Sequence, residues 1–217
     1  MTTPPQKIPD GLIVMFEGLD GVGKSTQLKK AAEELRIAGW PVHTTRNLGG
    51  TPIGEALRKA MLSKLERPAA TDFYVSIAIQ EALIEELEAQ RKAGKIVLID
   101  RGPLSLAAYQ IYGSGFDEAT GWRAVDDGMQ SIHPELIIAY HANIDRAIDR
   151  AQHESGVPDY FESKPPAFFK RVAKGYEIAA DRYPVRVLNA NRSIDAIHTE
   201  TMELIERAIA TKLTFAP

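Results

Sequence analysis

Short apolar runs alternate with longer amphipathic stretches along almost the whole chain. The runs at 12–16, 41–45, 95–100, 135–140 and 185–189 predict five strands. The first, third and fourth are nearly continuous in apolar residues, which is typical of strands covered on both faces of a parallel sheet. The alternation therefore predicts an α/β fold, a doubly wound parallel five-stranded sheet flanked by helices, with its ligand at the carboxyl ends of the strands.

The amphipathic stretches between these runs predict the helices. They lie at 24–38, 52–63, 72–93, 104–112, 120–131, 143–153, 166–181 and 193–211. Gly94 follows the third of them as a C-cap glycine. We expect residues 1–217 to form a single domain with a disordered lead-in at 1–10. A segment at about 146–164, rich in charge and proline, is either an ordinary surface loop or a mobile lid.

Composition narrows the kind of partner. The net charge of −3 over 217 residues provides no basic field, so we expect no nucleic-acid polymer and no membrane as partner. The absence of cysteine excludes a disulfide framework, a thiolate metal site and a cysteine nucleophile. The early apolar run at 12–16 is far shorter than the ~20 residues that span a bilayer. These features predict a cytoplasmic protein that acts on a small ligand.

The stretch "FEGLDGVGKST" is the most specific motif. It satisfies G-x-x-x-x-G-K-[ST] directly after a predicted strand and at the start of a predicted helix, which is the context of a phosphate-binding loop. We expect Lys24 to bridge the β- and γ-phosphates of ATP and the Ser25 hydroxyl to bind Mg²⁺. The loop residues expected to hold ATP are Gly18, Leu19, Asp20, Gly21, Val22, Gly23, Lys24, Ser25 and Thr26. The plainer alternative is a glycine-rich turn with an exposed lysine.

A second candidate follows the strand in "KIVLIDR". Asp100 ends this strand and can bind the Mg²⁺ shell, as the aspartate of the second nucleotide-binding motif does. Arg101 comes next, and its guanidinium suits bidentate binding of a phosphate. The plainer alternative is that Asp100 only begins a loop after a core strand.

Four segments together resemble the thymidylate kinase family of the nucleoside monophosphate kinase group. They are "FEGLDGVGKSTQ", "TRNLGGTPIGEALR", "DRGPLSLAAYQ" and "DYFESKPPAFFKRVAKGY", they stand in the family's order, and they cover most of the chain. The resemblance implies Mg²⁺-ATP-dependent phosphoryl transfer to a deoxynucleoside monophosphate, dTMP to dTDP. It also implies a homodimer.

The resemblance assigns substrate roles residue by residue. Asp20 would face the sugar 3′-hydroxyl, and Arg46 and Arg101 would clamp the 5′-phosphate. Tyr109 would lie against the sugar, and Ser105 belongs to the same motif. Each has a plainer alternative as a turn, loop or packing residue.

The chain departs from the family at the positions that contact the base. The thymine-contacting arginine falls on Ile79, and a polar residue at the base edge falls on Leu106. The stacking phenylalanine falls on Val75, although Phe73 or Tyr74 could substitute with a small shift. A site built to hydrogen-bond a base loses discrimination when those groups are aliphatic. The sequence therefore leaves the acceptor base open.

The lid departs as well. The positions of the family's lid arginines fall on His153, Ser155 and Tyr160. We expect Arg150, a nearby arginine, to join Lys24 and Arg101 as a catalytic residue, since arginine stabilises charge on the transferring phosphoryl group. Alternatively, Arg150 belongs to the solvated face of a helix.

Three functions therefore stay open. The first is a nucleoside monophosphate kinase for dTMP. The second is the same chemistry on a different or modified acceptor, which Ile79, Val75 and Leu106 favour. The third is a nucleotide-binding protein with weak or no kinase activity, which the altered lid favours and the intact phosphate-binding loop opposes.

Overall fold

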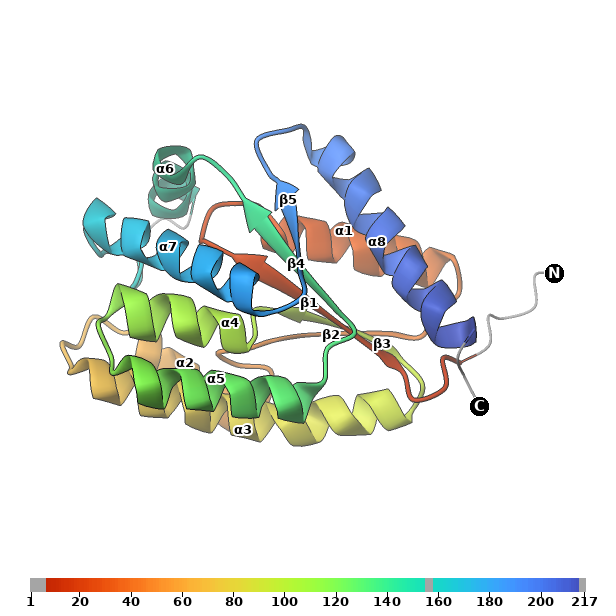
Figure 1. The fold of residues 1–217 in the computed structure, drawn as a ribbon, viewed down its shortest axis with the longest axis horizontal. Coiled ribbons are helices and arrows are strands. Elements are labelled where there is room, and N and C mark those ends of the chain that lie inside the picture. The colour runs from red at the N-terminus through yellow and green to blue at the C-terminus, as the bar shows by residue number, and fades with distance from the viewer. Residues whose placement is uncertain (1–6, 155–157, 215–217) are drawn as a thin grey trace.

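The computed structural model describes residues 7–154 and 158–214. Five strands form one parallel sheet in the order β2-β3-β1-β4-β5, which confirms the predicted doubly wound α/β fold (Figure 1). The strands are β1 (Leu12–Gly18), β2 (Val42–Arg46), β3 (Ile96–Asp100), β4 (Leu136–His141) and β5 (Val185–Asn189). The loops at the carboxyl ends of β1 and β3 therefore lie next to each other, because these two strands are paired.

Helices cover both faces of the sheet. They are α1 (Lys24–Ile37), α2 (Pro52–Leu62), α3 (Ala69–Lys92), α4 (Pro103–Leu106), the π-helix η1 (Ala107–Gly113), α5 (Glu118–Ile132), α6 (Ile144–Glu154), α7 (Pro166–Arg182) and α8 (Ile194–Thr214). Figure 1 shows α1 and α8 on one face, and α3, α4, α5 and α7 on the other. None of the described helices is long and apolar enough to cross a bilayer.

The central strand β1 contributes side chains to two hydrophobic clusters, one on each face of the sheet, because successive side chains of a strand point to opposite faces. Leu12, Val14 and Phe16 belong to the cluster that includes the buried residues of α1 and α8. Ile13 and Met15 belong to the cluster built with α3, α4 and α5. This two-sided burial accounts for the continuous apolar run that predicts the strand.

Helix ends follow ordinary capping chemistry. Thr51 accepts a hydrogen bond from the Gly54 amide, and Pro52 occupies the first turn of α2. Gly94 ends the α3 region with φ +75°, as a C-cap glycine should. The Thr51 cap fixes the start of α2, whose Arg58 and Leu62 line the cavity described below.

Two segments differ from the sequence-based expectations. The helix expected at 104–112 is a short α-helix, α4, continued by the π-helix η1. Ile8, inside the expected disordered lead-in, is fully buried, and its amide donates to the Gly94 carbonyl at 3.3 Å. Residues 1–6 of that lead-in lie outside the described residues.

Candidate active site

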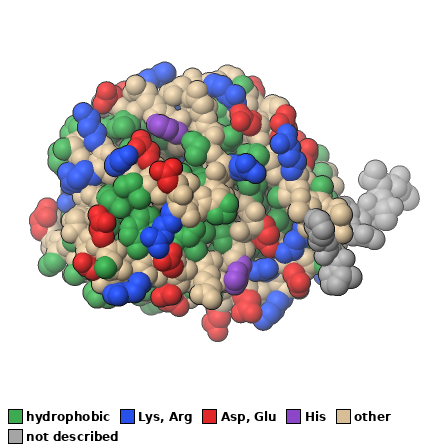
Figure 2. All heavy atoms as spheres, in the orientation of Figure 1, with side chains coloured by type: hydrophobic (Ala, Val, Ile, Leu, Met, Phe, Trp, Pro, Cys, Tyr) green, Lys and Arg blue, Asp and Glu red, His purple; other side chains and the backbone are tan. Residues whose placement is uncertain are grey.

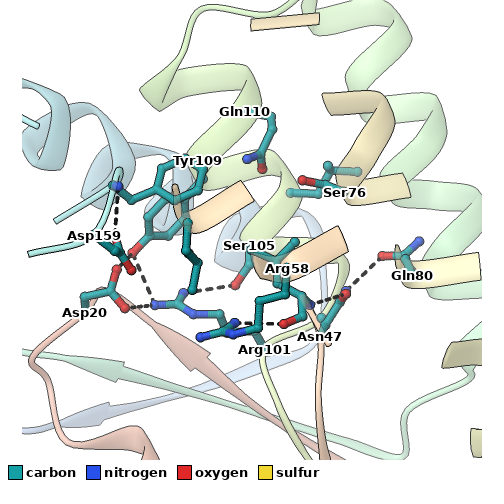
Figure 3. A pocket seen from close by; sticks show the side chains of 15 residues that line it. Asp20, Asn47, Arg58, Ser76, Gln80, Arg101, Ser105, Tyr109, Gln110 and Asp159 are labelled. Atoms are coloured by element: carbon teal, nitrogen blue, oxygen red, sulfur yellow. Dashed lines mark hydrogen bonds and ion pairs between the residues drawn. The ribbon is translucent and has the colours of Figure 1, made fainter. Parts of the chain in front are cut away.

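A cavity lies at the carboxyl edge of the sheet, beside the phosphate-binding loop (Figure 3). Its wall comes from the loop after β1, the segments after β2 and β3, helices α2, α3, α4 and η1, and residues 159–161. The charged and polar side chains of the wall are Asp20, Asn47, Arg58, Ser76, Gln80, Arg101, Ser105, Tyr109, Gln110 and Asp159. The cavity is therefore polar at the loop side and can hold a charged small molecule.

Arg101 is the centre of the hydrogen-bond network in this wall. Its guanidinium donates to the Asp20 carboxylate, to the Tyr176 hydroxyl at 2.7 Å and to the Gly18 carbonyl at 3.1 Å. The Arg101 backbone has φ +72°, a left-handed conformation that is uncommon for a residue with a side chain. Such conformations persist where surrounding contacts enforce them, and they cluster at functional sites.

Asp20 is held ionised by its neighbours. Burial alone would raise the pKa of its carboxyl group, but the charges of Arg101 and Lys24 and the Tyr109 hydroxyl outweigh burial and lower that pKa to about 2. The Tyr109 hydroxyl donates to the Asp20 carboxylate at 2.5 Å. The structure thus brings together Asp20, Arg101, Ser105 and Tyr109, four of the predicted substrate residues.

The phosphate-binding loop lies between β1 and α1, as the motif predicts. Gly23 has φ +95° and immediately precedes Lys24, the first residue of α1. The Lys24 ammonium is buried and donates to the Leu19 carbonyl at 2.8 Å. Burial and the nearby charge of Arg101 lower the pKa of Lys24 to about 8, against the opposing effect of Asp100, Asp20 and Glu17.

Gly21, at the tip of this loop, packs against α6. A Cβ atom at Gly21 would lie 2.1 Å from the Ala147 carbonyl oxygen, so only glycine allows this close approach. The loop and the helix that opens the expected lid are therefore in direct contact.

Ser25 and Asp100 fit a magnesium site. The Ser25 hydroxyl donates to the Asp100 carboxylate at 2.6 Å across the paired ends of β1 and β3. Among the described residues, no group of three or more acidic or histidine side chains could hold a metal by itself. One hydroxyl and one carboxylate are what Mg²⁺ requires when substrate phosphates and water supply its other ligands.

Arg46 does not line the cavity, in contrast to its predicted role as a phosphate clamp. Its guanidinium forms a bidentate ion pair with Glu55, at 3.0 and 2.7 Å, and Glu55 also accepts from the Gly50 amide. Arg58 of α2 lies in the wall instead and donates to the Leu48 carbonyl at 2.7 Å (Figure 3). The sequence contained a signal for Arg58, because it ends the segment "TRNLGGTPIGEALR".

Arg58 and Arg46 should differ in their effect on binding of the acceptor. We expect Arg58→Gln to raise the KM for the acceptor monophosphate by about tenfold or more, since a charge-assisted hydrogen bond to phosphate is lost. Arg46→Gln serves as the matched control and should change that KM by less than about threefold. Steady-state kinetics of both variants test the assignment, and a larger effect of Arg46→Gln would contradict it.

Ile79 and Val75 do not line the cavity either, although the family pattern puts its base-contacting residues at these positions. Ile79 is fully buried in the hydrophobic core, whereas Ser76 and Gln80 line the wall. A shift of one residue along a helix turns the side chain by about 100°. The helix therefore presents a hydroxyl and an amide to the cavity, and Leu106 is in the wall as expected.

The amides of the wall were missed by the sequence-based reasoning. The Asn47 side chain accepts from the Leu48 amide at 2.8 Å and donates to the Gln80 amide oxygen at 3.3 Å. Gln110 is 3% exposed, and its amide points toward the cavity in Figure 3. A signal for Gln110 was present in the "AYQ" of the third family segment.

The expected lid is only partly described. Residues 155–157, which include Ser155, and the side chain of His153 lie outside the described residues. Arg150 is exposed on α6. Tyr160 is buried, its amide donates to the Leu62 carbonyl at 3.1 Å, and the Arg67 guanidinium lies 3.7 Å from the centre of its ring. An aromatic ring therefore stands where the family pattern has an arginine.

Comparisons with known proteins agree with this geometry. The family model "Thymidylate kinase" matches residues 16–201. The thymidylate kinase of Paracidovorax citrulli is 34% identical over 207 residues, which cover 91% of this chain and 93% of the relative. That of Cupriavidus metallidurans is 36% identical, with 90% and 98% covered, and that of Alkalilimnicola ehrlichii is 32% identical, with 94% and 96% covered. The chain therefore belongs to the thymidylate kinase family, whose members are nucleoside monophosphate kinases.

Proposed function

We propose that this protein transfers the γ-phosphoryl group of ATP to dTMP, with Mg²⁺. The observation that carries the proposal is the Asp20–Arg101–Tyr109 network, which lies between the phosphate-binding loop and the cavity at the carboxyl edge of the sheet. The donor phosphates and the acceptor phosphate would meet beside that network, since Arg101 lines the cavity and donates a hydrogen bond to the Gly18 carbonyl of the phosphate-binding loop. Family membership supports the same reaction.

The donor side uses the loop and its neighbours. Backbone amides of the loop and the start of α1 favour an anion, and the Lys24 charge lies at the same place. Ser25 and Asp100 would hold Mg²⁺, which neutralises charge on the phosphates when it is bound. Lys24 would exchange its hydrogen bond to the Leu19 carbonyl for one to phosphate oxygens.

The acceptor side uses the cavity. Arg58 and Arg101 would bind the 5′-phosphate, and Asp20 and Tyr109 would contact the sugar. Chemical transfer requires mainly positioning and charge stabilisation, since the protein contributes little covalent chemistry to phosphoryl transfer. Arg150, exposed on α6, would be a further catalytic residue if the segment at about 146–164 acts as a lid.

A different acceptor base has its own supporting observation. The base end of the cavity holds Ser76, Gln80 and Gln110 beside Leu106, so amides and a hydroxyl replace charged groups there. A side-chain amide carries both a donor and an acceptor and can pair with the edge of more than one base. This set of side chains therefore favours, as the second candidate, an acceptor with a base other than thymine.

The test is ADP release with Mg²⁺-ATP and a panel of nucleoside monophosphates. We expect kcat/KM for dTMP to exceed that for dUMP by about tenfold, the effect of one methyl group in a fitted pocket. Preference for another monophosphate would overturn the dTMP assignment but keep the reaction class. Nucleotide binding without turnover on any acceptor would support a binding protein instead.

A homodimer and a cytoplasmic location are further parts of the proposal. The family resemblance implies a dimer, and large apolar side chains are exposed near α2 and α3: Ile53 at 57%, Leu65 at 71% and Tyr74 at 61%. Light scattering on the purified protein tests the dimer. In Figure 2, acidic and basic side chains are interspersed over the face viewed.

A further inference from the structure

A buried glutamate lies directly beneath Arg101 and has no role in the reaction described above. Glu17, in β1, is completely inaccessible to solvent. Its carboxylate accepts hydrogen bonds from the Gly102 amide at 2.8 Å, the Ser105 amide at 3.3 Å and the Ser105 hydroxyl at 2.7 Å. One side chain therefore holds both ends of the turn that follows Arg101.

The hydrogen bonds between Glu17 and Arg101 have a fixed direction. A guanidinium can only donate, so the Tyr176 hydroxyl oxygen accepts from Arg101 at 2.7 Å. The Tyr176 proton is then free for the Ser105 oxygen at 2.8 Å, and the Ser105 proton goes to the Glu17 carboxylate. Every donor in this series has an acceptor only when Glu17 is ionised.

We propose that Glu17 is a positioning residue for phosphoryl transfer, because its carboxylate is the terminal acceptor of the hydrogen-bond series that orients the Arg101 guanidinium toward the acceptor nucleotide. The inference rests on the proposed function. Glu17 itself lies behind Arg101 and Ser105 and does not line the cavity. The left-handed backbone of Arg101 is enforced from the Glu17 side by the hydrogen bond to the next residue, Gly102.

Glutamine at position 17 has the same shape but cannot complete the series. With its nitrogen toward Ser105, that hydroxyl must donate to Tyr176, and the Tyr176 proton is left without an acceptor in the series. With its nitrogen toward the turn, it faces the Gly102 and Ser105 amides, which are also donors. The first orientation leaves the Tyr176 hydroxyl without an acceptor and the second leaves both amides without one, so the turn and Arg101 must shift.

The ionisation of Glu17 gives the proposal a pH signature. Burial raises the pKa of Glu17 from 4.5 to about 7, although the Ser105 hydroxyl, Arg101, the Gly102 amide and Lys24 oppose the shift. The charged or titratable groups that face it are Arg101 after β3, Lys24 on α1 and Tyr176 on α7. As the pH falls below about 7, Glu17 takes up a proton and the series loses its terminal acceptor.

The free energy of unfolding should depend on pH in the sense opposite to activity. The folded pKa of Glu17 is higher than its ordinary value of 4.5, so the folded protein binds a proton between pH 4.5 and 7 that the unfolded chain has released. The contribution of this group to the free energy of unfolding is therefore full below pH 4.5 and is lost as the pH rises to about 7. Activity requires the charged form, whereas folding favours the neutral one.

The kinetic test compares wild type, Glu17→Gln, Tyr176→Phe and the double variant at about pH 8, above the Glu17 pKa. We expect Glu17→Gln to raise the KM for dTMP about tenfold while the KM for ATP changes less than about twofold. The double variant should resemble Glu17→Gln alone, because both changes break one series. Equal increases in both KM values, or effects that multiply, would show that Glu17 only supports the fold.

The pH dependence provides the second measurement. In wild type the KM for dTMP should rise as the pH falls below about 7, and this rise should be smaller in Glu17→Gln. The nucleotide phosphate also titrates, with a pKa of about 6, but it does so equally for both proteins. The difference between the wild-type and Glu17→Gln profiles therefore reports on Glu17. Identical profiles would overturn the proposal.

Failure of the proposed function can be separated from failure of this inference. Wild type without turnover on dTMP would refute the function. In that case, urea unfolding between about pH 5 and 8 still tests the buried carboxylate, since wild type should lose stability relative to Glu17→Gln as the pH rises. If Glu17→Gln does not fold, two measurements still test the proposal: the KM of wild type for dTMP as a function of pH, and the KM of Tyr176→Phe for dTMP. A wild-type KM that does not change with pH, together with an unchanged KM in Tyr176→Phe, would overturn the proposal.

Discussion

Replacing Lys24 by methionine lowers kcat by about 10³-fold, which is the largest effect we expect of any single substitution. Methionine keeps the length of the side chain and removes the charge, so the phosphate-binding loop can keep its shape. The loss falls on kcat because the Lys24 charge matters most when negative charge moves between the donor and acceptor phosphates. Single-turnover kinetics with saturating ATP measure it.

Lys29→Met is the matched control, because Lys29 is exposed on the same helix, α1. Its kcat should stay within about twofold of wild type, as expected for a surface substitution. Nucleotide binding by Lys24→Met should survive in weakened form, since backbone amides of the loop contribute most of the anion site. A variant that binds ATP and keeps its kcat would exclude Lys24 from the chemistry.

Arg101→Lys lowers kcat/KM for the acceptor by about 10²-fold, the second largest effect. The substitution keeps the charge and removes the planar group that contacts Asp20, Tyr176, Ser105 and the Gly18 carbonyl together. A lysine ammonium cannot reach these partners and an acceptor phosphate at the same time. We also expect a loss of about 2 kcal/mol in the free energy of unfolding, since buried hydrogen-bond partners are left unpaired.

Arg171→Lys is the control that distinguishes a loss of activity from a loss of stability. Arg171 makes several hydrogen bonds to carbonyl oxygens, those of Tyr112, Gly113 and Ala167, but it does not line the cavity. Because Arg171 is exposed, this variant should lose only about 0.5 kcal/mol or less in the free energy of unfolding, and its kcat/KM should stay within about threefold of wild type. If both arginine variants lose activity in proportion to stability, then Arg101 acts through the fold alone.

The local sequence pattern was sufficient to predict the strands and the phosphate-binding loop. All five strands were predicted, and β1, β3 and β4 most directly, because they are buried on both faces and therefore contain almost no polar residue. The phosphate-binding loop could be recognised because its chemistry needs glycines, a lysine and a hydroxyl at fixed spacing in one continuous segment.

The side of α3 that faces the cavity could not be predicted from the sequence alone. The aligned positions Ile79 and Val75 lie outside the cavity wall, whereas Ser76 and Gln80 lie in it. One residue of offset in α3 changes a core side chain into a wall side chain, and only packing of α3 against α2 and α5 decides the offset. The expected helix at 104–112 likewise becomes partly π-helical at Tyr109 and Gln110, which hydrophobic spacing does not reveal.

The sequence by itself determined the parts whose chemistry is local: the parallel α/β fold, the phosphate-binding loop with Lys24 and Ser25, and Asp100 with Arg101 at the end of a strand. Only the tertiary structure decided which distant groups meet. It pairs Arg46 with Glu55, brings Arg58 to the cavity, and buries Glu17 beneath Arg101. The physical reason is that burial and hydrogen-bond partners depend on neighbours far away in the chain, whereas strand pattern and loop spacing depend on neighbours along it.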